Sequence, residues 1–205
     1  MHRQVAIFIS LLLVLTIGVV AAGYATGTGP LGIISIGMTR VISGETMVPS
    51  RTLVKEVEAP AAPEIEGAPW VNSEPLTLKN LRGRVVVIEF WTYGCYNCRN
   101  TLPFIQSWDA RYRDKGLTII GVHTPEFDTE RDVDTLRREV GELKIKYPVV
   151  SDNDYSNWKA YRVEAWPTLF VLDKQGRVRW SHVGEGGYEE TEQVIKQMLS
   201  EEDVR

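Results

Sequence analysis

Cysteine and histidine are scarce in this chain, and their scarcity excludes several classes of protein. The 205 residues include two cysteines and three histidines. Two cysteines cannot form the multiple disulfides that hold small secreted scaffolds together. A structural zinc ion needs four ligands, and His2, His123 and His182 stand isolated in the sequence. We therefore expect no metal site.

Runs of basic residues are also missing. The chain has 23 Lys and Arg residues against 27 Asp and Glu residues, which gives a net charge of −4. This balance offers no electrostatic reason to expect nucleic-acid binding. The chain shows no internal repeat, and its hydrophobic content of 43% is ordinary for a globular protein with a core. Its length corresponds to about one domain with extensions.

A long apolar stretch without a charge occupies residues 5–22 near the N-terminus. It is long enough to span a membrane and longer than the usual core of a signal peptide. Arg3 precedes it and the next basic residue is Arg40, so the positive-inside rule exports the rest of the chain. A cleaved signal peptide is the alternative, because small-x-small patterns follow the stretch. We favour the first alternative, in which residues 1–25 form a retained membrane anchor. Both alternatives place the cysteines outside the cytoplasm.

Composition divides the remaining chain into a spacer and a folded domain. Residues 54–69 are rich in Pro, Ala and Glu. Such a composition is typical of an extended, poorly packed chain. We therefore expect residues 26–69 to form a linker and residues 70–205 to form a domain large enough for its own core.

Hydrophobic patterns within the domain predict alternating strands and helices. Apolar runs rich in β-branched residues predict strands at 84–91, 117–123, 148–151, 168–173 and 178–183, with a short edge strand and turn at 76–83. Apolar residues spaced three or four apart predict helices at 95–115, 129–144, 154–161 and 189–199. This order predicts an α/β sandwich whose sheet is mainly parallel with an antiparallel edge.

The two cysteines, Cys95 and Cys98, form a C-x-x-C motif where a predicted strand gives way to a predicted helix. The first sulfur should lie at the helix N-terminus, where free N–H groups and the helix dipole stabilise a thiolate. We predict that Cys95 attacks a disulfide and that Cys98 resolves the mixed disulfide. This two-electron exchange needs no cofactor. Tyr96 and Asn97 carry no charge, so the thiolate depends mainly on the helix terminus.

The residues around the cysteines resemble those of the thioredoxin superfamily. The carrying residues are W-T-Y-G-C-Y-N-C at 91–98, Pro103, Trp166-Pro167-Thr168 and Gly184. The segments 70–83, 121–127 and 152–161 are most similar to the exported TlpA type and to the C-terminal domain of the DipZ type. The resemblance implies a thioredoxin-like three-layer sandwich with a mixed central sheet, preceded by the transmembrane or signal segment.

A further candidate site residue is Glu89, which lies in an apolar strand where thioredoxin has a buried acid. A carboxyl group in such a strand is costly to bury unless it is neutral or paired. We expect Glu89 to accept the proton of Cys98, and the alternative is a structural ion pair. His123 also lies at a strand end, where a lone histidine is more often structural, and a role near the active site is the alternative.

The resemblance also implies a substrate-binding segment at Trp166, Pro167 and Thr168. A cis peptide bond before Pro167 would present a backbone edge that a partner's extended segment can join. Trp166 would then contact the partner, or it would pack as a partly buried aromatic residue. The sequence leaves these two roles of Trp166 open.

The predicted function is extracytoplasmic thiol–disulfide exchange with protein partners, in the reducing direction. The resemblance implies a role in keeping thiols reduced, such as those of apocytochromes awaiting haem, with electrons from a membrane partner of the DsbD or CcdA type. Peroxidase activity is an alternative: Thr92 fits the threonine of peroxiredoxins, but Ile88 stands where they have a proline. A second alternative is a copper-delivery or redox-gated binding module, since two thiolates can hold Cu(I). Copper-assembly relatives, however, use the spacing C-x-x-x-C with a distant His.

Overall fold

A computed structural model describes residues 53–55 and 58–202. The apolar stretch at 5–22 and most of the expected linker lie outside the described residues. Within the described part of the chain, no helix is long and apolar enough to cross a membrane.

One sheet of six strands organises the described residues, in the order β1-β4-β3-β2-β5-β6. The strands are β1 (Trp70–Val71), β2 (Val85–Trp91), β3 (Leu117–His123), β4 (Val149–Ser151), β5 (Thr168–Leu172) and β6 (Val178–Val183). The pairs β2–β3 and β3–β4 are parallel, whereas β1, β5 and β6 each pair antiparallel with their neighbours. The predicted mixed sheet is therefore confirmed.

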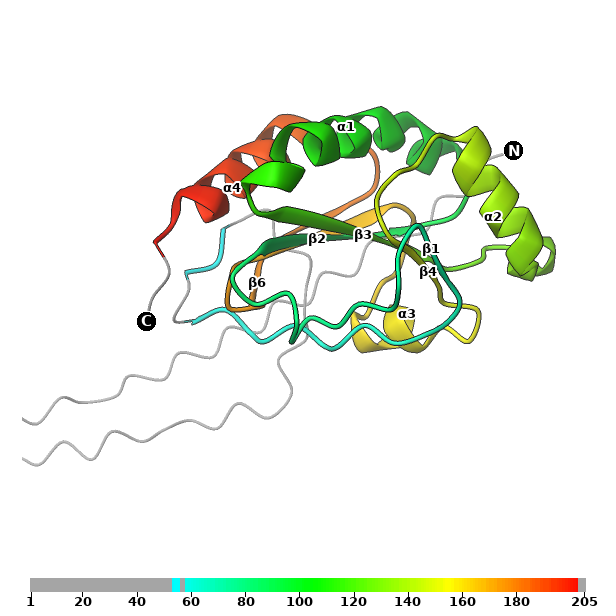
Figure 1. Cartoon of the computed structure of the whole chain (residues 1–205), viewed down its shortest axis with the longest axis horizontal. Helices are drawn as coiled ribbons and strands as arrows, with labels where there is room; N and C mark the ends of the chain where they lie inside the picture. Colours follow the sequence, from blue (N-terminus) through cyan, green and yellow to red (C-terminus); the bar gives the residue numbers. More distant parts are fainter. Residues whose placement is uncertain (1–52, 56–57, 203–205) are drawn as a thin grey trace, which may run out of the picture. The chain divides into compact units, whose positions relative to one another are not determined.

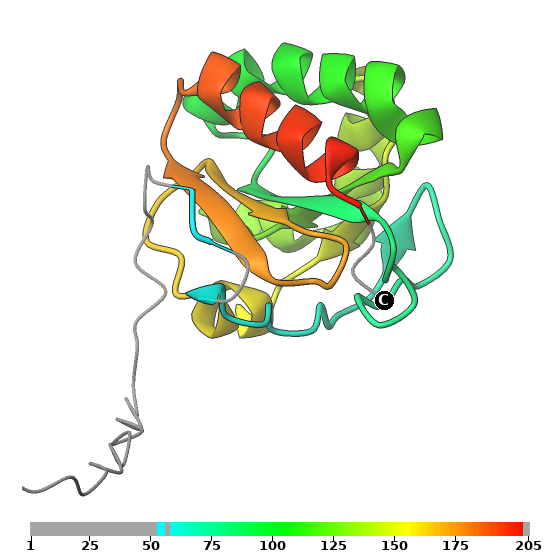
Figure 2. The same cartoon turned by 90° about the vertical axis from the view of Figure 1, so that its left-hand side faces the viewer.

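Helices cover both faces of this sheet. They are α1 (Tyr96–Tyr112), α2 (Val133–Glu142), α3 (Ser156–Ala160) and α4 (Tyr188–Ser200). Figures 1 and 2 show α1 and α4 side by side over one face and α3 beneath the other. The result is the predicted α/β arrangement of three layers.

The central strand β2 explains why the sheet has a core on each side. All of its residues are buried. Side chains alternate along a strand, so Val87 and Trp91 enter the core under α1, α2 and α4. Ile88 and Phe90 enter the opposite core. A strand covered on both faces needs the continuous apolar run that the sequence shows here.

The packed domain begins before Trp70, so the expectation of a linker up to residue 69 is wrong for residues 58–69. Ile65 is buried in the core on the α3 side. The hydroxyl of Tyr161 donates to the carbonyl oxygen of Pro63 at 2.6 Å, and the N–H of Glu66 donates to Asn157 at 2.9 Å. By such contacts the backbone N–H and C=O groups of an extended segment can be hydrogen-bonded without a helix or a strand.

The edge of the sheet also differs from the prediction. Residues 76–83 form turns rather than an edge strand, with Leu78 inserted into the core. The edge position is taken by β1, in which Trp70 pairs with Val150 of β4. Two residues are too few to produce the alternating pattern that marks a strand in sequence.

Two predicted helices are shorter than expected because a 3-10 helix takes up part of each predicted range. The helix predicted at 129–144 divides into the 3-10 helix η3 (Asp128–Arg131) and α2. Asp132 separates them, and its side chain accepts the N–H of Thr135 at 2.8 Å, as an N-cap does. The helix predicted at 95–115 ends as the 3-10 helix η2 (Arg113–Lys115).

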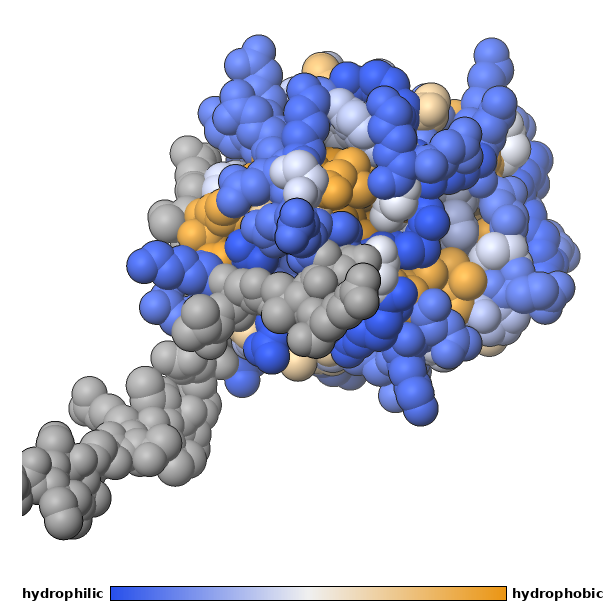
Figure 3. All heavy atoms as spheres, turned by 60° about the vertical axis from the view of Figure 1, so that its left-hand side comes forward, coloured by the Kyte–Doolittle hydropathy of each residue, from blue (hydrophilic) through white to orange (hydrophobic). Residues whose placement is uncertain are grey.

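The surface is mostly polar, as expected when most of the apolar side chains lie in the core. On the face in Figure 3, charged and polar residues cover most of the coloured surface, with apolar residues visible between them. Among the described residues, the large hydrophobic side chains that stay exposed are Tyr96, Phe104 and Phe127. Two of these three lie beside the cysteines.

Candidate active site

Cys95 and Cys98 lie where β2 has ended and α1 begins, as predicted. They form a disulfide with their Cα atoms 5.3 Å apart. Cys95 is the N-cap of α1, and its sulfur accepts a hydrogen bond from the N–H of Cys98 at 3.2 Å. No acidic residue lies in the first turn of α1. In the reduced protein, the same N–H and the helix dipole favour the thiolate of Cys95.

The two sulfur-bearing residues differ in exposure. Cys95 is 9% exposed and Cys98 is 1% exposed. Cys95 also lines a surface hollow, whereas Cys98 is absent from its lining. A partner disulfide can therefore reach Cys95 before Cys98.

The hollow over Cys95 is built from three segments. Its lining residues are Gly94, Cys95, Tyr96, Asn97, Glu126, Phe127, Glu164, Ala165 and Trp166. Tyr96 is 76% exposed and Phe127 is 61% exposed. Exposed aromatic side chains at a reactive site are typical of surfaces that bind a partner protein.

The peptide bond between Trp166 and Pro167 is cis, which confirms the prediction. The carbonyl oxygen of Pro167 accepts the N–H of Gly184 at 2.7 Å. Gly184 has a φ of 85°, a conformation that favours glycine. The glycine noted in the sequence thus fixes the segment that holds the cis bond.

Trp166 and Thr168 have different surroundings. Trp166 is half-buried: its indole N–H donates to the carbonyl oxygen of Thr124 at 3.0 Å, and its ring packs on Trp158 at 4.3 Å. It also lines the hollow, so both roles considered for it have a structural basis. Thr168 is buried, and its hydroxyl donates to the carbonyl oxygen of Ala165 at 2.7 Å. The Thr168 side chain therefore shapes the segment from inside.

Glu89 is fully buried on the face of β2 that packs against α1. One carboxyl oxygen, Oε2, accepts the hydroxyl of Tyr147 at 2.9 Å, and the other has no hydrogen-bond partner among the described residues. Burial raises the pKa of Glu89 to about 7, although the hydrogen bond from Tyr147 lowers it. In the part of the chain that the structure describes, Glu89 forms no ion pair. A carboxyl that titrates near neutrality suits a proton acceptor.

His123 is buried next to the active-site loop. Its Nε2 lies 3.2 Å from the hydroxyl oxygen of Thr92, and the ring of Tyr93 stacks on it at 5.2 Å. Burial lowers the pKa of His123 to about 4, so the ring is neutral near pH 7. These contacts are those of a structural residue beneath the loop.

Glu130 is a site residue that the sequence did not reveal. It is buried, and its carboxylate accepts N–H groups from Gly94 at 3.1 Å, Glu126 at 2.6 Å and Phe127 at 3.2 Å. These bonds join two walls of the hollow. The only signal in the sequence is a glutamate three residues after Phe127, the spacing at which an acid caps the start of a helix.

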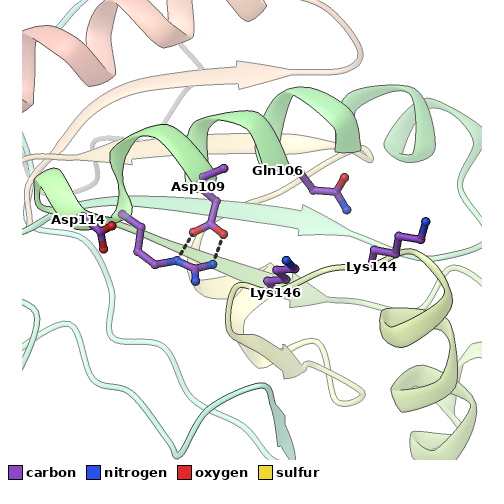
Figure 4. Close-up of a pocket in the computed structure, with 7 residues that line it drawn as sticks. Gln106, Asp109, Asp114, Lys144 and Lys146 are labelled. Carbon is purple, nitrogen blue, oxygen red and sulfur yellow. Dashed lines mark hydrogen bonds and ion pairs between the residues drawn. The ribbon is translucent and has the colours of Figure 1, made fainter.

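A larger hollow lies elsewhere, between α1 and the segment that follows α2 (Figure 4). There Asp109 forms an ion pair with Arg113, and Lys144 and Lys146 line the side of the hollow opposite α1. None of its lining residues belongs to the hollow over Cys95. The described residues also include no group of three or more His, Cys, Asp or Glu side chains placed to hold a metal ion.

Comparison with known proteins connects this site to an enzyme family. Residues 59–181 match the AhpC/TSA family. Protein DipZ of Mycobacterium bovis is 40% identical over 144 residues, which make up 68% of this chain and 21% of DipZ. The thiol-disulfide oxidoreductase YkuV of Bacillus subtilis is 26% identical over 140 residues, 68% of this chain and 94% of YkuV.

A solved structure extends the comparison to the fold. The crystal structure of a thiol-disulfide isomerase from Corynebacterium glutamicum is 30% identical, with a TM-score of 0.62 over 69% of this chain and 98% of that one. The chain spans about a fifth of the length of DipZ, so only this domain is compared there. By sequence and by fold, the chain belongs to the AhpC/TSA family and is a thioredoxin-like thiol–disulfide oxidoreductase of the TlpA/DipZ-like type.

Proposed function

We propose that this chain reduces disulfides of exported proteins while residues 5–22 hold it at the membrane. The observation that carries the proposal is the asymmetry of the cysteine pair. Cys95 caps α1 and lines a hollow with exposed aromatic residues, whereas Cys98 lies buried behind it. This arrangement suits attack on a protein disulfide followed by internal resolution.

The reaction begins when the Cys95 thiolate attacks one sulfur of the partner's disulfide. A bond forms between Cys95 and that sulfur, the partner's own disulfide breaks, and its other sulfur leaves as a thiolate. The Cys98 thiol then gives its proton to Glu89 and attacks Cys95. The partner sulfur that was bonded to Cys95 leaves and takes up a proton, and a disulfide now joins Cys95 and Cys98. Two electrons have passed from the dithiol to the partner.

The partner's backbone has a place to bind during this exchange. Trp166, the residue before the cis bond, lines the hollow together with Tyr96 and Phe127, whereas Pro167 itself is buried and does not line it. An extended segment can pair with such a backbone edge while its side chains contact the aromatic rings. Thr168, buried beneath, holds the segment in position.

The reducing direction and the compartment rest on the resemblance and on the apolar stretch at 5–22. An anchored reductant outside the cytoplasm needs electrons from across the membrane, so a donor of the DsbD or CcdA type completes the cycle. Its clients would be thiols that must stay reduced, such as those of apocytochromes before haem attachment.

Peroxidase chemistry is disfavoured by the surroundings of Thr92. That side chain is fully buried, and its hydroxyl lies 3.2 Å from His123. Ile88, at the position of the peroxiredoxin proline, is a core residue of β2. A peroxide at Cys95 would therefore lack both the free threonine hydroxyl and the proline of the peroxiredoxin site.

The test is to trap partners with Cys98→Ser in the native cells. This variant can form a mixed disulfide through Cys95 but cannot resolve it. We expect exported proteins to be captured, and the same proteins to become oxidised in cells that lack the chain. The control is the variant with both cysteines changed to serine, which should capture nothing. Capture of cytoplasmic proteins alone, or no capture, would overturn the proposal.

A further inference from the structure

The surroundings of Glu89 contain one polar side chain that comes from outside the cysteine motif. Tyr147 lies in the segment just before β4 and is fully buried. Its hydroxyl donates to Oε2 of Glu89 at 2.9 Å. Because burial raises the pKa of Tyr147 well above its usual value, the phenol stays protonated and acts as a donor.

A glycine makes the approach of Tyr147 possible. Gly121 of β3 pairs with Glu89 in the sheet. A Cβ atom on Gly121 would lie 2.8 Å from Nε1 of Trp91 and 3.2 Å from Cε2 of Tyr147. Only a residue without a side chain leaves room for both rings at this position.

No other described group takes over the role of Tyr147. The strand neighbours of Glu89 are Gly121 and Leu169, which do not ionise. The buried residues of α2 and α4 on this face are also non-ionising. The buried ionisable residues of α1 are Cys98, Asp109 and Tyr112. Asp109 is engaged with Arg113, and the hydroxyl of Tyr112 donates to Glu192 at 2.6 Å.

We propose that Tyr147 is a positioning residue for the exchange reaction: its hydroxyl orients the Glu89 carboxyl and sets how readily that group takes the proton of Cys98. A hydrogen bond to the carboxylate form stabilises the charge that burial disfavours. Without it, Glu89 stays protonated to higher pH and cannot accept the proton when Cys98 attacks. This inference rests on the proposed role of Glu89.

The test is an infrared titration of the Glu89 carboxyl in the oxidised full chain, where the cysteines do not titrate. The carbonyl band of the protonated acid should vanish with a midpoint near the pKa of about 7, and Glu89→Gln should lack the band. Tyr147→Phe should move the midpoint up by about one pH unit. The acid limb of the disulfide-exchange rate should move in the same direction.

Two further variants separate a specific effect from a general one. Tyr161→Phe removes another buried tyrosine hydroxyl, which bonds to Pro63 on the opposite face, and it should leave the midpoint unchanged. Gly121→Ala keeps the phenol but displaces its ring, and it should raise the midpoint even if Tyr147→Phe does not fold.

The outcomes distinguish this inference from the proposed function. An unchanged midpoint in both Tyr147→Phe and Gly121→Ala overturns the role of Tyr147, whatever the exchange activity. An equal shift in Tyr161→Phe also overturns it, because the effect would then follow from any core change. A specific midpoint shift in a protein that exchanges no disulfides would support the Tyr147–Glu89 coupling and overturn the proposed function instead.

Discussion

The carboxylate of Glu130 accepts the backbone N–H of Gly94 at 3.1 Å, so a residue of η3 holds the peptide that precedes Cys95. The other carboxylate oxygen accepts the N–H groups of Glu126 and Phe127. One buried carboxylate thus ties the cysteine loop to the loop that presents Phe127. A side chain at Gly94 would not fit, since its Cβ would lie 2.2 Å from Oε1 of Glu130.

Glu130→Ala should lower the free energy of unfolding by about 2–3 kcal/mol, because three backbone N–H groups lose a charged acceptor. Urea unfolding of the oxidised protein measures the change. Glu142→Ala is the control, because Glu142 is 64% exposed and its nearest ion-pair partner, Arg138, lies 3.9 Å away. Equal losses in the two variants would contradict the role of Glu130.

Glu89 should make the oxidised protein less stable as the pH rises from about 4.5 to about 7. The pKa of Glu89 is about 7 in the folded protein and 4.5 in the unfolded chain. The unfolded chain therefore loses its proton first, and the stability present below pH 4.5 falls by about 3 kcal/mol by pH 7. Glu89→Gln should abolish this part of the pH dependence, as measured by urea unfolding at several pH values. A pH profile unchanged by the substitution would contradict the prediction.

His123 should have the opposite effect over an overlapping range. Its pKa is about 4 in the folded protein and 6.5 in the unfolded chain. The unfolded chain binds a proton first as the pH falls, so stability that is complete above pH 6.5 declines by about 3 kcal/mol toward pH 4. His123→Phe, which keeps an aromatic ring beside Tyr93, should remove this acid sensitivity. If His123→Phe is as acid-sensitive as the wild type, His123 is not buried as the neutral ring.

The exposed aromatic residues should matter for partners and not for folding. Tyr96→Ala and Phe127→Ala should each raise KM for a protein disulfide about tenfold, because each removes part of the contact surface. Reduction of a small disulfide and the free energy of unfolding should change little. Phe104→Ala, which removes an exposed ring that stacks on Tyr188, is the matched control and should leave KM unchanged. A similar KM in all three variants would contradict this assignment.

Features carried by continuous segments were predictable from the sequence. The apolar run of β2 showed a buried strand, and the spacing of Cys95 and Cys98 placed the reactive sulfur at the start of α1. The cis bond before Pro167 followed from the resemblance of its neighbours. In each case the information lies within a few adjacent residues, where local periodicity or a motif expresses it.

Contacts between distant segments were not predictable in the same way. Tyr147 is 58 residues from Glu89, and Glu130 is 36 residues from Gly94. The burial of Ile65 was not predictable because a Pro- and Ala-rich composition indicates an extended chain but does not show whether that chain packs on the core. Tertiary structure decides which partner such residues meet.

The unequal reactivity of the two sulfurs is the most direct test of the account. Cys98→Ser and Cys95→Ser each leave one thiol, and the rate at which each reacts with a small aromatic disulfide at pH 7 can be followed by absorbance. The exposed N-cap position predicts that Cys95 reacts at least about tenfold faster than Cys98. Mass spectrometry should find the adduct on Cys95. Equal rates, or faster reaction of Cys98, would contradict the assignment of Cys95 as the attacking sulfur.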